Sequence, residues 1–123
     1  MTYQVDRLFA AVTVLAAHGH IKQRLIRAYE EYLDDILDEE LPIAARETFA
    51  DLRGQMHRVA PLNGEGPICA SVRKMSVQEA SDCAVSVVEL YRQVSQHADD
   101  SDRIVPIDQD LPETVPRFLV KSI

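Results

Sequence analysis

The chain has no tryptophan, and its 123 residues include only three phenylalanines and four tyrosines. The hydrophobic share of 46% is therefore supplied mainly by leucine, isoleucine, valine and alanine. A core of such side chains suits close helix packing better than a β-sandwich, whose strands are enriched in aromatic and β-branched residues. Composition thus favours an all-α fold, and the length suits a single domain that buries its own core.

Cysteine is also scarce, since the chain contains only Cys69 and Cys83. Their spacing matches neither the Cys-x-x-Cys pattern of a redox dithiol nor the paired ligands of a zinc site. Cys83 falls on an apolar stripe, and we interpret it as a buried, reduced thiol.

The motifs of common catalytic and metal sites are missing as well. No glutamate is followed three positions later by a histidine, the pair that holds di-iron or di-manganese in helical bundles. The Gly-x-Ser-x-Gly elbow and the phosphate-binding loop motif are both absent. His18 and His20 could form a metal pair, but histidines at a helix junction are more often capping or exposed groups. We therefore expect no catalytic residue, no metal and no cofactor.

The chain lacks a long apolar run. The longest, residues 8–17, is shorter than the roughly 18 residues that a membrane span needs. No basic region precedes this run, and no small-residue cleavage pattern follows it. We expect a cytoplasmic protein with no membrane partner.

Basic residues are fewer than acidic ones, because the chain has 13 lysines and arginines and 20 aspartates and glutamates, which gives a net charge of −7. Such a chain repels phosphate backbones unless its cations are gathered on one face. The sequence shows no such gathering, so a nucleic-acid partner is not expected.

Apolar residues recur every three or four positions in four stretches of the chain, which predicts four amphipathic helices. Together they indicate an antiparallel bundle. The predicted helices run from about Val5 to His18, from residue 20 to 39, from Pro42 to Ala60 and from Ser76 to Gln96.

Two of these helices have additional features. The first is apolar on more than one side, and such a helix is usually central in a bundle or shared between two protomers. The fourth has a sharp start, because Ser76 and Glu79 have the Ser-x-x-Glu spacing of a capping box. For residues 68–74, just before that start, the pattern does not decide between an extended segment and a helical turn.

The C-terminal part differs from the rest in containing three prolines. Prolines at this spacing leave no room for a helix of useful length. Apolar residues remain frequent there, Phe118 and Leu119 among them. The sequence therefore predicts a helical domain over residues 1–97 and an extended tail over residues 98–123 that docks on the bundle or on a partner chain.

One cluster has the composition of an anion site. Arg73, Lys74 and Ser76 combine two cations, a hydroxyl and the free N–H groups of a helix start, which together can hold a phosphate or a carboxylate. The preferred alternative is that the two cations pair with the acidic end of the second predicted helix.

That acidic end contains Asp34, Asp35, Asp38 and Glu39. Acids at a helix C-terminus oppose the helix dipole. The simplest explanation is that they also precede the N-terminus of the third helix, where negative charge is favourable. A second explanation is that they bind a partner.

Three functions remain open at this stage. The preferred one is a non-enzymatic interaction protein, a homodimer that uses the first helix and the tail, including Phe118 and Leu119, as its contact. The alternative is a binder of an anionic ligand, or a minor enzyme acting on one, at the start of the fourth helix, with Glu65 or His57 as acid or base. A third is an adaptor that presents the acidic segment to a basic partner.

Overall fold

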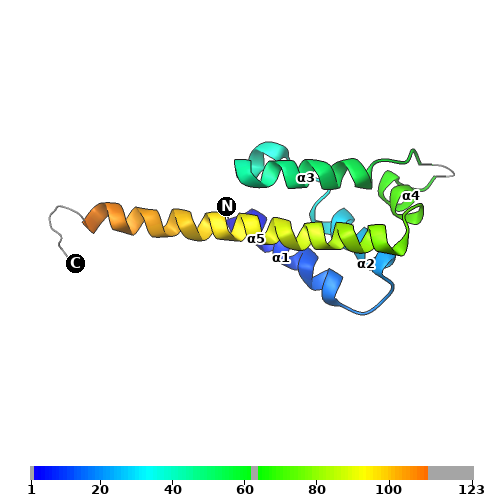
Figure 1. The fold of residues 1–123 in the computed structure, drawn as a ribbon, viewed down its shortest axis with the longest axis horizontal. Coiled ribbons are helices and arrows are strands. Elements are labelled where there is room, and N and C mark those ends of the chain that lie inside the picture. The colour runs from blue at the N-terminus through cyan, green and yellow to red at the C-terminus, as the bar shows by residue number, and fades with distance from the viewer. Residues whose placement is uncertain (1, 62–63, 111–123) are drawn as a thin grey trace.

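The computed structural model describes residues 2–61 and 64–110, and this part of the chain is all-helical without any strand (Figure 1). The prediction of an all-α bundle is confirmed. The helices are α1 (Thr2–Ala16), α2 (Ile21–Tyr32), the short 3-10 helix η1 (Asp38–Glu40), α3 (Ile43–Met56), α4 (Pro67–Arg73) and α5 (Val77–Asp110).

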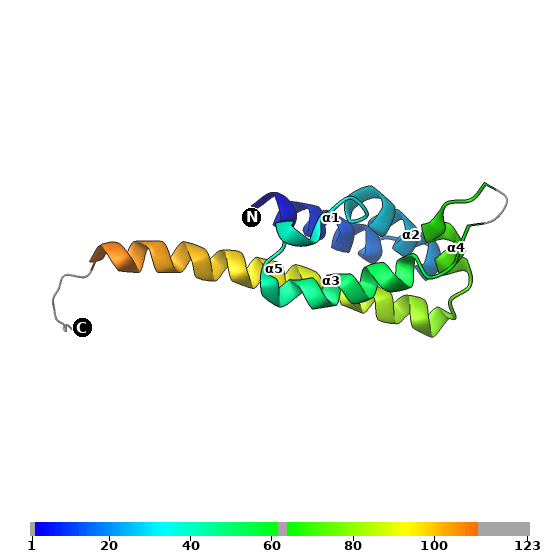
Figure 2. The same ribbon diagram turned by 90° about the horizontal axis from the view of Figure 1, so that it is seen from above.

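The long helix α5 is the central helix of the fold. It packs against α1 on one side and α3 on another, and it also contacts α2. Figures 1 and 2 show α3 lying beside α5 with the opposite chain direction. The short α4 packs on α2 and α3 near the start of α5.

The core is built from the predicted apolar stripes. Leu8, Leu25 and Phe49 from three different helices are almost inaccessible to solvent. Burial of one such side chain contributes roughly 1.5 to 3 kcal/mol, so the stripes supply most of the driving force for folding. Helix α5 contributes its buried positions at the spacing of a single helical face: Ala80, Cys83, Val87, Leu90 and Val94.

The predicted capping box at the start of α5 is present. The backbone N–H of Glu79 donates to Ser76 Oγ at 3.0 Å, and the Ser76 N–H donates to a Glu79 carboxylate oxygen at 2.8 Å. Two N–H groups that have no acceptor inside the helix are thereby satisfied.

The second helix is shorter than its stripe predicts. Instead of continuing to residue 39, α2 ends at Tyr32, and the N–H groups of Leu33 and Asp34 share the Tyr29 carbonyl. Arg53 of α3 then donates to the carbonyl oxygens of Asp34 and Ile36 at 2.9 Å each. These carbonyls are satisfied by a side chain from another helix, so the chain can turn there without leaving acceptors unpaired.

Residues 68–74, which the sequence pattern left undecided, belong to α4. Pro67 occupies the first turn of this helix, where its missing N–H costs nothing. Ile68 and Val72 lie on its buried side.

The last helix is longer than predicted. The pattern places its end near Gln96, whereas α5 continues to Asp110 and includes Pro106. A single proline removes one backbone hydrogen bond and can kink a helix without ending it. The expected domain boundary at residue 98 therefore falls inside a continuous helix. Residues 111–123, the remainder of the predicted tail, lie outside the described residues.

Candidate functional site

Arg73 of the predicted anion site is engaged by an acid of the preceding loop. Its guanidinium donates to the two carboxylate oxygens of Glu65 at 2.6 and 3.3 Å, and this hydrogen-bonded pair raises the pKa of Arg73. The expectation that Arg73 and Lys74 neutralise the acidic end of α2 is wrong for Arg73. Lys74 is exposed and forms no ion pair within 4.0 Å in the described part of the chain.

The third member of the set, Ser76, uses its hydroxyl in the capping box. The Glu79 carboxylate lies at this helix start, and the hydrogen bond from the Ser76 N–H lowers the pKa of Glu79. An anionic ligand at this end of α5 would meet that negative charge. Arg73 and Ser76 are thus engaged in two separate local contacts, whereas Lys74 has no ion pair in the described chain that would join it to either of them.

The acidic end of α2 obtains its counter-charges from α1 and α3. Arg7 of α1 donates to Asp35 at 2.8 Å, and His57 Nε2 lies 3.2 Å from an Asp34 carboxylate oxygen. These contacts, together with Arg53, explain how acids can lie at a helix end that disfavours them. Asp38 and Glu39 stay exposed. A surface hollow of about 340 Å³ is lined by Asp34, Asp35, Ile36, Leu37, Asp38, Glu39 and Arg53.

The two residues considered as acid or base have different partners. Glu65 pairs with Arg73, and His57 pairs with Asp34 at the end of α3. No group of three or more metal-ligating side chains occurs among the residues that the structure describes. Phe118 and Leu119, the predicted contact residues of the tail, lie outside the described residues.

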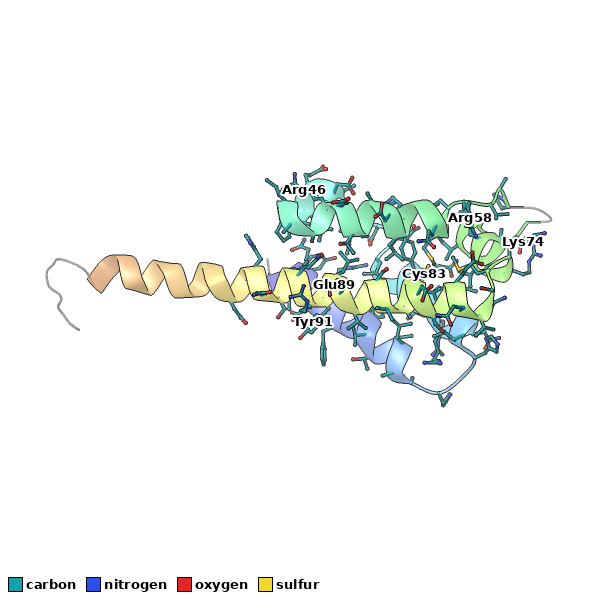
Figure 3. All side chains as sticks on the ribbon, in the orientation of Figure 1. Arg46, Arg58, Lys74, Cys83, Glu89 and Tyr91 are labelled. Atoms are coloured by element: carbon teal, nitrogen blue, oxygen red, sulfur yellow. The ribbon has the colours of Figure 1, made fainter. Side chains whose placement is uncertain are left out.

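An exposed apolar surface follows the seam between α1 and α5, and we name it the α1–α5 face. Phe9, Val85 and Val88 are 56, 65 and 47% exposed. The ring centroids of Phe9 and Tyr91 are 5.8 Å apart, so an aromatic contact joins the two helices. Figure 3 shows that Tyr91 lies on the side of α5 that faces away from α3.

Two hollows that share Val88 make this face continuous. The first holds about 250 Å³ and is almost entirely apolar, whereas the second holds about 430 Å³ and has a mixed lining. The first is lined by Val12, Leu15, Ala16, Ile21, Arg24, Ala84, Val85 and Val88. The second is lined by Val88, Tyr91, Arg92, Ser95, Gln96 and Asp99.

Arg24 is held at one end of the α1–α5 face by backbone groups of the last turn of α1 and of the α1–α2 connection. It donates to the carbonyl oxygens of Leu15 and Gly19. Arg92 lies at the other end and donates to Glu89 and Gln96 of its own helix. Arg24 and Arg92 therefore flank the apolar part of the groove, and Ser95, Gln96 and Asp99 line its polar continuation beyond Arg92.

The sequence pattern identified only half of this face. It predicted the broad apolar surface of the first helix, but it did not predict that Val85 and Val88 of the fourth helix are exposed. The sequence feature that could have indicated the exposed half of the face is the group of three valines at positions 85, 87 and 88. They cover more of a helix circumference than one stripe needs.

Helix α5 continues beyond the rest of the bundle. Val94 is its last buried position among the side chains that the structure describes, which reach Asp99. Figures 1 and 2 show the helix projecting past α1 and α3. We name residues 95–110 the overhang; at about 1.5 Å per residue its length is about 24 Å.

Comparison with known proteins gives no match, since no protein-family model, curated protein or solved structure is similar to this chain. In the part of the chain that the structure describes, no helix combines the length and the apolar character needed to cross a membrane.

Proposed function

We propose that the protein is a non-enzymatic interaction protein that works as a homodimer, with the α1–α5 face as its contact surface. The observation that carries this proposal is the continuous exposed surface formed by Phe9, Val85 and Val88 beside a helix that projects from the bundle. Contiguous apolar surface of this kind is typical of interaction sites.

The overhang supports the same proposal. Isolated helices shorter than about 12 to 15 residues are marginal in water, and most helices in proteins are stabilised by packing of one face. Residues 95–110 are a segment of about 16 residues, close to that limit, and they contain a proline, so packing against a partner would stabilise their helical state. A second copy offers an apolar groove of the right kind without requiring any other protein.

The site chemistry favours interaction over catalysis. Arg73, Ser76, Asp34 and His57 are each engaged in a local contact, and these contacts are spread over different parts of the fold. We also propose a cytoplasmic location. It is supported by Cys69 and Cys83, which are both free thiols.

Sedimentation velocity of the full chain over a hundredfold concentration range tests the proposed function. Wild-type protein is expected to sediment as a dimer at micromolar concentration. Val88→Asp should weaken the dimer by at least about a hundredfold, because a buried aliphatic side chain contributes roughly 1.5 to 3 kcal/mol and each dimer contains two copies.

The matched control is Ile43→Asp. Ile43 is 80% exposed but lies at the start of α3, away from the α1–α5 face. This variant should keep the wild-type association, and circular dichroism should confirm that both variants are folded. A wild-type chain that stays monomeric at high micromolar concentration would refute the proposed function.

A further inference from the structure

We propose that two copies pair through antiparallel α5 helices, with the two-fold axis beside Ser95, so that each overhang covers the α1–α5 face of the other copy. This arrangement rests on the proposed homodimer and specifies its geometry. Such a contact is isologous, because the same groove and the same overhang are used twice.

The lengths of the two elements match. The α5 part of the face that precedes the overhang runs from Ala84 to Arg92, which corresponds to about 14 Å of helix. The overhang is longer, at about 24 Å, so it can cover this whole stretch in an antiparallel pair. By register, the segment Ile104–Ile107 then lies opposite residues 84–87.

The charges favour the antiparallel direction. The overhang sequence contains five aspartates and one arginine. A parallel pair would place the two acidic segments side by side, where like charges repel. In the antiparallel pair, each acidic segment instead runs along a groove with Arg24 at one end and Arg92 at the other.

One ion pair fixes the register. With the axis beside Ser95, position 92 of one copy is opposite position 99 of the other. Arg92 and Asp99 line the same hollow, and Asp99 is exposed and has no ion pair among the described residues. On one helix they are about 10.5 Å apart along the axis, which is too far to pair, so this contact forms only between copies.

Disulfide trapping tests the direction of pairing. In a Cys69→Ser, Cys83→Ala background that still sediments as a dimer, Ser95→Cys should give a covalent dimer on mild oxidation, because position 95 is close to its own copy across the axis. Val88→Cys on the same face should not, because its counterpart is position 103. Efficient trapping of Val88→Cys would establish a parallel pair and overturn the proposal.

A charge-reversal cycle tests the register. Arg92→Glu and Asp99→Lys should each weaken the dimer about tenfold, and the double variant should recover most of that loss. Asp51→Lys, an equal charge change at an exposed position of α3, is the control and should have little effect.

The outcomes separate this inference from the proposed function. A wild-type dimer in which Ser95→Cys is not trapped, or in which the two charge reversals are additive, overturns the antiparallel register and leaves the homodimer standing. A monomeric wild type refutes both. Residues 111–123 of the same chain would then be the alternative occupant of the groove.

Discussion

Among single residues, Tyr29 combines the deepest burial with an unmet polar group. Its side chain is fully buried, and its hydroxyl has no hydrogen-bond partner among the described residues. Burial raises the pKa of Tyr29 to about 12, so the phenol stays neutral over the usual pH range. A buried hydroxyl without a partner costs about 1 to 3 kcal/mol, whereas the ring itself fills the core.

Tyr29→Phe is therefore expected to leave the free energy of unfolding unchanged or to raise it by up to about 1 kcal/mol. Urea unfolding followed by circular dichroism measures the change. Phe49→Ala, which removes a buried aromatic ring, should lose about 3 to 5 kcal/mol and shows that the assay detects core damage. A clear loss of stability in Tyr29→Phe would mean that the hydroxyl has a partner.

Glu79 gives a pH dependence with a defined sign. Its pKa in the folded chain lies below the ordinary value because the carboxylate accepts the Ser76 N–H. This contribution to stability is fully present above the unfolded-state pKa, about 4.3, and is lost as the pH falls through the folded-state pKa. The stability difference between wild type and Glu79→Gln should thus be larger at pH 6 than at pH 3. An equal difference at both pH values would contradict the assigned role. The pKa of Glu89 is also lowered, by its partner Arg92, but Glu89 is present in both proteins, so its contribution cancels in the stability difference.

At the scale of the element, the start of α5 depends on its cap. Ser76→Ala removes the acceptor of the Glu79 N–H and should cost about 1 kcal/mol of stability. Ser81→Ala, the same chemical change inside the same helix, is the control and should be neutral or slightly stabilising, since alanine is the better helix former. Equal effects of the two substitutions in urea unfolding would show that the cap has no special role.

The sequence predicted those elements whose position is determined by residues within the element itself. Four apolar stripes and the Ser76–Glu79 box identified α1, α2, α3 and the start of α5, because each pattern is contained in one segment. The end of α2 was not predictable in this way. It depends on Arg53 reaching two carbonyls 17 and 19 positions away, and no pattern within α2 carries that information.

For a related reason, only the α1 part of the α1–α5 face was predictable from the sequence. The breadth of the apolar surface on α1 is visible in the sequence. Whether Val85 and Val88 are covered or exposed depends on which neighbours pack on α5, and that is a property of the assembled fold. Likewise, the pairing of Arg73 with Glu65 depends on the path of the loop before α4.

At the scale of the whole molecule, the proposed dimer links stability to concentration. Folding and association are coupled when the contact forms only between folded chains, so the melting temperature rises with protein concentration. The unfolding entropy is about 2.1 cal/mol/K per residue, or about 0.5 kcal/mol/K for two 123-residue chains. A tenfold concentration increase should therefore raise the melting temperature by about 3 °C.

Differential scanning calorimetry at several concentrations measures this shift, and the variants show where it comes from. Val88→Asp should abolish the concentration dependence, because it introduces a charge into the α1–α5 face, whereas Ile43→Asp should preserve it. Added salt should reduce the shift only in part, since ion pairs such as Arg92 with Asp99 are screened and the apolar contact is not. A melting temperature independent of concentration in the wild type would mean that the exposed face of α1 and α5 is not covered by a second copy. The overhang would then have to be stabilised within one chain.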